Sequence, residues 1–186
     1  FALSEKKTVI VGLDLRIPKL AEEFNLVNHS GVVNYLIKQK SLSEIVNKTK
    51  IPYLDVILSG PVPPNPSELL IGETMKEFIE ELKKTYDYII LDTPPVGLVS
   101  DALELIQFSD VTLYVVRQNY TKKEMIMLLN NRVKRGELSN VSIVLNGFEN
   151  KAKYGSAYGY GYGNYSNGYH EEEEKEGFVK SIFNKF

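Results

Sequence analysis

The chain contains 186 residues, 43% of them hydrophobic, which is enough for one globular domain with a sizeable core. Its formal net charge of −2 excludes a general attraction to nucleic acid, so we expect no nucleic-acid partner. The lack of cysteine excludes disulfides and thiolate metal sites, and two isolated histidines argue against a histidine metal site.

Strands and helices are predicted to alternate along the first half of the chain. Apolar β-branched runs predict strands, and Asn65-Pro66-Ser67-Glu68 predicts a helix start with Asn as the N-cap and Pro at the first helical position. The elements expected here are strands at Thr8–Gly12 and Leu54–Leu58 and helices at Gly31–Lys38, Leu42–Lys48 and from Pro66 to about Thr85.

The same alternation continues to about residue 150. The further elements expected are strands at Tyr88–Asp92, Val111–Val116 and Val141–Asn146 and helices at Ser100–Phe108 and Lys122–Arg135. The strands are continuous apolar runs, which is typical of a parallel sheet that is covered on both faces. We therefore predict an α/β fold with a mostly parallel sheet and helices on both faces.

Two aspartates directly follow predicted strands, at the edge of the sheet where open α/β proteins bind ligands. Asp14 ends the sequence VIVGLD, and Asp92 ends YIILD. A strand-end aspartate can hold Mg²⁺ beside nucleotide phosphates, although it can also cap a loop or a helix. Because both aspartates stand beside proline-stiffened loops, we favour a magnesium site that they share.

The chain resembles the bacterial tyrosine kinases of the deviant Walker ATPase class in an ordered series of motifs. VIVGLDLRIPKL is similar to their second Walker motif, and YDYIILDTPP is similar to their Walker B motif. The further matches, in chain order, are SGPVPPNPSELL, VSDA, VVRQNYTKK and IVLNGF. Walker B alone is a weak signal, but the ordered set covers nearly all of residues 8–148 and is specific. The resemblance implies a P-loop NTPase fold.

The resemblance implies ATP and Mg²⁺ as cofactors, and it gives each candidate residue a role. Asp14 and Asp92 are expected to position Mg²⁺ on the ATP phosphates. Arg16 is expected at a subunit contact or near the nucleotide. Asn146, at the end of the last strand, is expected to contact adenine, and Arg117 is a further candidate for the nucleotide pocket.

The resemblance also implies partners and a location. The family accompanies capsule and exopolysaccharide export at the cytoplasmic face of the bacterial inner membrane, and its kinase subunits form rings. Its kinase domain is either fused to, or bound by, a membrane protein that helps to set polysaccharide chain length. A tyrosine phosphatase is a further expected partner.

A tail rich in tyrosine, glycine and glutamate is expected at residues 151–176. The resemblance implies that its tyrosine cluster is the phosphoacceptor, namely Tyr154, Tyr158, Tyr160, Tyr162, Tyr165 and Tyr169. Glycine supplies the freedom to reach a neighbouring active site, and each phosphate would add about −1.5 to −2 charge beside four glutamates. The alternative is an aromatic low-complexity segment that self-associates.

Two departures from the family pattern bear on activity. The family usually has an aspartate at the position of Gly12, and Asp101 is a candidate substitute, although it can equally be an acid in the first turn of a helix. No GxxxxGK[ST] phosphate loop occurs in the sequence. We therefore expect this loop, its central strand and most of its helix to precede Phe1, residues 1–150 to be a partial kinase domain, and this segment alone to be inactive.

The last ten residues, 177–186, predict a short amphipathic helix. Its apolar face comprises Phe178, Val179, Ile182, Phe183 and Phe186. A helix of this length is marginal in isolation, so we expect it either to dock on the kinase body, a neighbouring subunit or the membrane, or to be a frayed end.

Three functions remain open at this point. The first is a tyrosine autokinase that controls polysaccharide export. The second is a partition- or septum-positioning ATPase on the same fold, against which the tyrosine-rich tail and the sequence PPNPSELL argue. The third is a non-catalytic assembly partner that has lost ATP chemistry.

Overall fold

The computed structural model describes residues 1–95 and 101–149 of the chain. The N-terminal elements are η1 (Ala2–Ser4, a 3-10 helix), β1 (Thr8–Gly12), α1 (Leu20–Glu23), α2 (Val32–Leu36), α3 (Leu42–Ile45), β2 (Val46–Lys48) and β3 (Leu54–Ile57). The remaining elements are α4 (Pro66–Ile71), α5 (Glu73–Lys83), β4 (Tyr88–Asp92), α6 (Asp101–Ile106), β5 (Thr112–Arg117), α7 (Lys123–Lys134) and β6 (Val141–Asn146). The six predicted acceptor tyrosines and the segment 177–186 lie outside the described residues.

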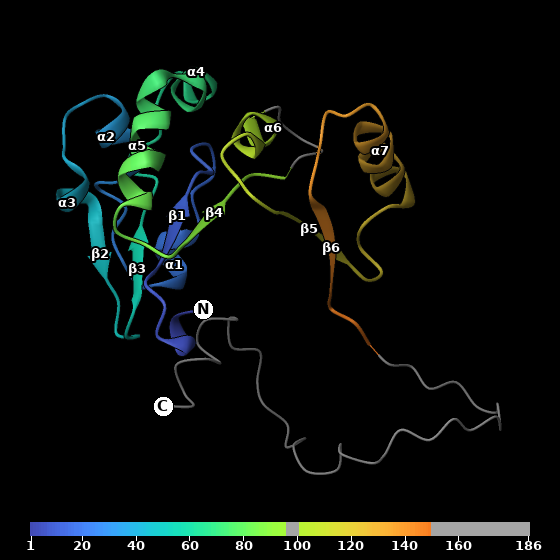
Figure 1. Cartoon of the computed structure of the whole chain (residues 1–186), viewed down its shortest axis with the longest axis horizontal. Helices are drawn as coiled ribbons and strands as arrows, with labels where there is room; N and C mark the ends of the chain where they lie inside the picture. The colour runs from blue at the N-terminus through green and yellow to red at the C-terminus, as the bar shows by residue number, and fades with distance from the viewer. Residues whose placement is uncertain (96–100, 150–186) are drawn as a thin grey trace, which may run out of the picture.

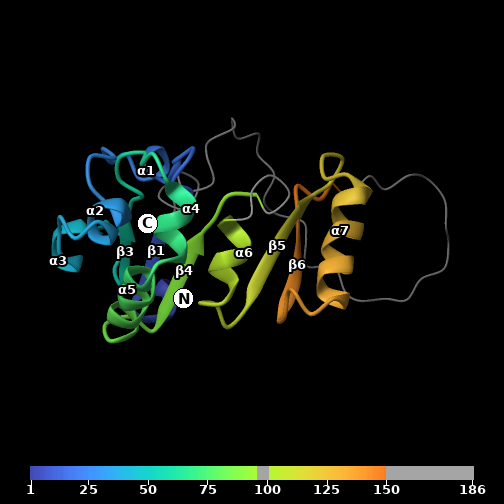
Figure 2. The same ribbon diagram turned by 90° about the horizontal axis from the view of Figure 1, so that it is seen from above.

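The strands form two sheets. In the first the order is β2-β3-β1-β4, with β1 parallel to both β3 and β4, and β2 antiparallel to β3 at one edge. The second sheet consists of β5 and β6, which run parallel. Figures 1 and 2 show α6 between the two sheets and α7 beside β6, on the side away from α6. The predicted α/β fold with mostly parallel strands is confirmed.

The main core lies between the first sheet and the helices that pack on it. Strand β1 buries Val9 and Val11 completely. Helix α5 buries Met75, Phe78 and Leu82 at intervals of three and four residues, which places them on one face of the helix. This apolar stripe is the reason that α5 packs lengthwise on the sheet (Figure 1). In the part of the chain that the structure describes, no helix is both long and apolar enough to span a membrane.

The predicted helix over Leu42–Lys48 is wrong in its second half. Its start is correct, and the Ser41 backbone N–H donates to the Glu44 carboxylate over 2.8 Å. However, α3 ends at Ile45, and the next three residues form β2. They do so because they pair with Asp55–Ile57 of β3, a tertiary contact that outweighs local helix preference.

The predicted single helix from Pro66 to about Thr85 is two helices. The start at Pro66 is correct, but the Asn65 side chain donates to the Glu68 carboxylate over 2.7 Å and makes no cap bond to the helix backbone. Gly72, whose ψ of 160° is extended, separates α4 from α5. This break gives α4 a direction independent of α5.

The predicted burial of every strand on both faces holds for β1 and β3 but not for β4 or for the second sheet. Leu113 and Val115 of β5 are 62% and 58% exposed, and Ile143 and Leu145 of β6 are 57% and 54% exposed. Within the described residues, β4 and β5 are each unpaired on one side, so the sheet is interrupted between them. The apolar runs of β5 and β6 are thus left without the cover that their sequence predicts.

Candidate functional site

The carboxyl ends of β1 and β4 form the first part of the candidate site. These neighbouring parallel strands are in register, so that Gly12 lies opposite Asp92. The backbone N–H of Leu13 donates to the Asp92 carbonyl over 2.8 Å, which extends the pairing by one residue. Asp14 follows directly, and the structure therefore brings Asp14 and Asp92 to the same edge of the sheet.

The two carboxylates interact electrostatically. Asp92 keeps solvent exposure, but the protein atoms around its carboxyl group desolvate it, and this burial raises its pKa above the ordinary value. Repulsion from the Asp14 carboxylate adds to the rise of the Asp92 pKa. A cation between the two groups would relieve this repulsion, which is the electrostatic condition for a metal site.

Asp14 also has the loop-capping role that the sequence left open. Its Oδ1 accepts hydrogen bonds from the backbone N–H groups of Arg16 (3.1 Å) and Ile17 (2.9 Å). These bonds hold the loop after β1 in a tight turn and orient the carboxylate. They do not use Oδ2, so capping and cation binding are compatible at this residue.

The donor set fits magnesium bound together with a nucleotide. Among the residues that the structure describes, no cluster of three or more His, Cys, Asp or Glu side chains could hold a metal ion. Magnesium is usually bound by one or two carboxylates, with water and phosphate oxygens completing its shell. The pair Asp14 and Asp92 fits that arrangement and does not fit a closed protein cage.

Arg16 extends from the same loop toward α4. Its guanidinium donates to the Ser67 hydroxyl over 2.9 Å. The contact joins the loop after β1 to the first turn of the helix that begins in the sequence PPNPSELL. The predicted role of Arg16 at a subunit contact or near the nucleotide stays a prediction.

The carboxyl ends of β5 and β6 bring Arg117 and Asn146 together. The two residues lie opposite each other in the parallel register, and the backbone N–H of Gln118 donates to the Asn146 carbonyl over 3.0 Å. The Asn146 Oδ1 accepts a bond from the Gly147 backbone N–H over 2.8 Å. The two predicted nucleotide-binding residues are thus neighbours, whereas their predicted roles are not tested by this arrangement.

Gly12 and Asp101 are the two positions that bear on the departure from the family pattern. At Gly12 an added Cβ would lie 3.3 Å from both the Leu20 side chain and the Ser59 backbone nitrogen, so a side chain fits there only if its neighbours move. Asp101 is the first residue of α6, as the alternative interpretation of that residue expected. Its side chain lies outside the described part of the structure.

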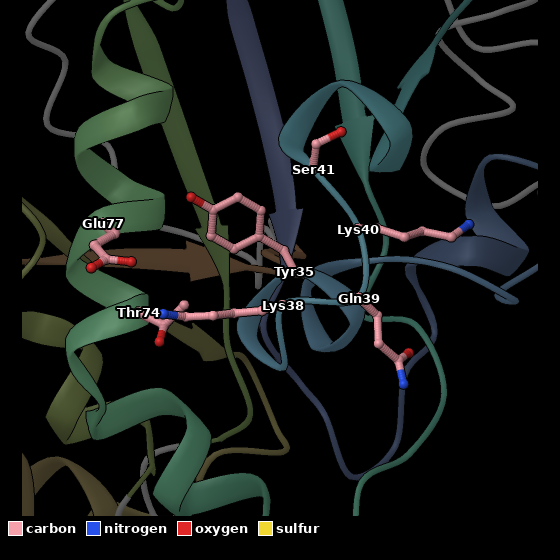
Figure 3. A pocket seen from close by; sticks show the side chains of 7 residues that line it. All are labelled: Tyr35, Lys38, Gln39, Lys40, Ser41, Thr74 and Glu77. Carbon is pink, nitrogen blue, oxygen red and sulfur yellow. The ribbon is translucent and has the colours of Figure 1, made fainter.

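One hollow on the described surface does not contain the predicted site residues. It has a volume of about 420 Å³ and is lined by Tyr35, Lys38, Gln39, Lys40, Ser41, Thr74 and Glu77 (Figure 3). The Tyr35 hydroxyl donates to the Glu81 carboxylate over 2.7 Å. Burial and this hydrogen bond raise the pKa of Tyr35 to about 12, so the phenol stays protonated and ties α2 to α5. We assign it a structural role and place the candidate site at the sheet edge, where register and charge coincide.

Comparison with known proteins defines the class of this fold and site. A family profile described as an AAA domain matches residues 5–143. The septum site-determining protein MinD from Pyrococcus horikoshii, solved with Mg-ADP, superposes with a TM-score of 0.59 over 77% of this chain and 60% of that chain, at 20% identity. The chain therefore has the α/β fold of P-loop NTPases, and at this identity the likeness to MinD shows the fold alone.

The relatives of higher identity are tyrosine kinases. The tyrosine-protein kinase YwqD of Bacillus subtilis is 35% identical over 160 residues, which cover 86% of this chain and 67% of YwqD. The kinase domain of the Escherichia coli tyrosine kinase ETK superposes with a TM-score of 0.75 at 32% identity, over 86% of this chain and 62% of that domain. The chain belongs to the family of bacterial tyrosine-protein kinases. It spans only 20% of another member, the kinase ptk of Acinetobacter johnsonii.

Proposed function

We propose that the intact protein is an ATP-dependent protein-tyrosine autokinase that regulates the polymerisation and export of a capsular polysaccharide or exopolysaccharide. The observation that carries this proposal is the meeting of Asp14 and Asp92 at the ends of two adjacent parallel strands. In a chain that belongs to the tyrosine kinases, this pair is the natural place for a Mg-nucleotide.

Each candidate residue then has a task in phosphate transfer. Asp14 and Asp92 hold Mg²⁺, which supplies neutralisation of the phosphate charge when it is bound. Asp14 is pre-oriented for this task by the two backbone N–H groups that bind its Oδ1. Asn146, at the end of β6, contacts the adenine, and Arg117, at the end of β5, belongs to the same nucleotide pocket. Arg16, which bonds to Ser67 of α4, contacts a neighbouring subunit or lies near the phosphates.

The gap between the two sheets supports an expectation about the intact protein. Among the described residues, β4 pairs only with β1 and β5 only with β6, which leaves one edge of each strand open. Ile90 and Val115 of these strands are 40% and 58% exposed. One parallel strand between β4 and β5 would join the sheets and satisfy both open edges. We propose that the strand of a phosphate-binding loop occupies this place, which would bring the loop to the edge that carries Asp14 and Asp92.

The partners and the location follow from the same proposal. The kinase subunits form a ring at the cytoplasmic face of the inner membrane, with a chain-length-determinant protein fused to them or bound by them. The tail tyrosines, 154 to 169, enter the site of a neighbouring subunit and are phosphorylated there, and a tyrosine phosphatase reverses the modification. Several phosphates beside the glutamates at 171–174 repel an anionic ATP site and loosen the ring.

Incubation of the intact protein with Mg-ATP, followed by mapping of phosphotyrosine by mass spectrometry, tests this function. We expect phosphate on the cluster between Tyr154 and Tyr169, and its loss in a variant with all six tyrosines changed to Phe. That variant should still bind ATP, because the tail is the acceptor and not the nucleotide site. ATP hydrolysis without phosphotyrosine would indicate a partition-type ATPase instead, and a lack of nucleotide binding would indicate a non-catalytic assembly partner.

A further inference from the structure

Tyr120 lies in the loop between β5 and α7 and has an unusual degree of exposure for an aromatic residue. The residue is 78% exposed, compared with 49% for Tyr53 and 39% for Tyr88. A tyrosine ring normally gains free energy by leaving water. Its position, three residues beyond the end of β5, is on the edge of the second sheet where Arg117 and Asn146 meet.

An ordered turn of the backbone presents the Tyr120 ring to solvent. The backbone N–H groups of Tyr120 and Thr121 both donate to the Arg117 carbonyl, over 3.2 and 2.9 Å. The Thr121 hydroxyl in turn accepts a bond from the Arg117 N–H over 2.8 Å. The Arg117 guanidinium carbon lies over the ring, 5.8 Å from its centroid, which is a cation–π contact. The turn sets the position of Tyr120, and the guanidinium contacts one face of its ring.

Arg117 also connects the ring to the end of β6. A Cβ built on Gly147 would lie 3.4 Å from the Arg117 Cγ, so the arginine stem packs against the backbone turn that follows Asn146. Gly147 has a φ of +64°, a conformation that side chains rarely adopt. Tyr120, Arg117 and Asn146 therefore form one corner, with the guanidinium between the ring and the β6 turn.

The chemistry of this corner suits a purine base. An exposed aromatic face stacks on any nucleobase, and a carboxamide can pair with the donor and acceptor edge of adenine. The Asn146 Oδ1 is oriented by the Gly147 N–H, and in the described residues its amide nitrogen has no hydrogen-bond partner. Donors of the Asn146 side chain are thus available to a ligand.

We propose that Tyr120 is the stacking platform for the adenine base of the bound nucleotide, and that Arg117 is the positioning residue that holds the ring. This inference rests on the proposed function, because it places the nucleoside at the ends of β5 and β6. It assigns Arg117 to the ring and not to the phosphates. Tyr120 then contributes to affinity through the base alone.

Calorimetric titration of the intact protein with Mg-ATP and with magnesium tripolyphosphate tests the platform, because the second ligand has no base. We expect Tyr120→Ala to weaken ATP binding roughly ten-fold and to leave tripolyphosphate binding unchanged. Tyr120→Phe keeps the stacking face and should bind ATP as the unchanged protein does. The matched control is Tyr53→Ala, an exposed tyrosine directly before β3, at the amino end of a strand of the first sheet, which should have no effect.

Two results would overturn the platform while leaving the proposed function intact. One is equal ATP affinity in Tyr120→Ala and the unchanged protein. The other is a parallel loss for ATP and tripolyphosphate, which would indicate a general disturbance of the edge. If the unchanged intact protein binds neither ligand, the proposed function itself fails, and the assignment of Tyr120 fails with it.

Discussion

Asp92→Asn should abolish phosphotyrosine formation by the intact protein and, at the same time, make the nucleotide-free protein more stable at neutral pH. Loss of a charged ligand at the phosphates is expected to reduce the rate by at least about 100-fold. The opposite effect on stability follows from the raised pKa of Asp92, whose first cause is desolvation and whose second is the Asp14 carboxylate. The Asp92 carboxylate, which is suited to bind the Mg-nucleotide, therefore lowers the stability of the protein when no nucleotide is bound.

The gain in stability of Asp92→Asn should depend on pH. Because folding raises the pKa of Asp92, the folded state favours the protonated carboxyl group. That stabilisation is fully present below the pKa of an unfolded aspartate, about 3.9, and is lost as the pH rises through the raised value. Asn keeps the shape without the charge, so the gain of Asp92→Asn over the unchanged protein should appear near pH 7 and vanish at acid pH.

Thermal unfolding at several pH values and a phosphotyrosine assay measure the two effects. The matched control is Asp87→Asn, at the amino end of the same strand, where the carboxylate accepts the Lys7 backbone N–H over 2.9 Å. This control should retain phosphotyrosine formation and should not gain stability. Full activity in Asp92→Asn, or a lower unfolding temperature at pH 7, would contradict our assignment.

Gly31→Ala should destabilise the protein by about 3 kcal/mol, the upper end of what overpacking costs. An added Cβ would lie 1.9 Å from the Leu58 carbonyl oxygen and 2.5 Å from the Gly60 nitrogen. Both are backbone atoms, so the end of β3 or the start of α2 must move. The φ of Gly31 is 179°, which any residue adopts, so the effect arises from space alone.

Gly31→Ala should also weaken the docking of α2 on the sheet. The Val32 N–H donates to the Leu58 carbonyl over 2.8 Å, and this bond docks α2 on the sheet. Denaturant unfolding of Gly31→Ala, compared with Gly72→Ala, measures the effect. At Gly72 the nearest atoms to an added Cβ are 3.7 Å away and φ is −68°, so the gain from a stiffer chain and the loss of a glycine N-cap of α5 should leave a change below about 1 kcal/mol. Equal stability of the two variants would refute the packing argument.

The parallel strands of the first sheet could be predicted from the sequence because their signal is local. Thr8–Gly12 and Tyr88–Asp92 match β1 and β4 to the residue, since each is a short apolar run that ends at a polar or glycine residue. The strand at Val46–Lys48 could not be predicted, because only its pairing with β3 makes it a strand. Likewise, nothing in the periodicity after Pro66 marks Gly72 as the end of a helix.

Some features of the candidate site could likewise be predicted from the sequence, and others could not. That Asp14 and Asp92 would meet could be inferred from the sequence, because the carboxyl ends of adjacent parallel strands share an edge. The loop-capping bonds of Asp14 and the contact from Arg16 to Ser67 required coordinates. Tyr120 lies within the family-like sequence VVRQNYTKK, but no periodicity distinguishes it from its neighbours, and its importance lies in the arginine that faces it.

The affinity of the intact protein for Mg-ATP, measured for Asp14→Asn, Asp92→Asn and the double variant, tests most directly that the two aspartates share one site. Asn preserves the oxygen that caps the loop after β1, so the change removes charge and little else. If both carboxylates hold the same ion, each single change should weaken binding about ten-fold or more, and the double change should add little to either. Independent losses that multiply in the double variant, or no loss at all, would contradict a shared magnesium site.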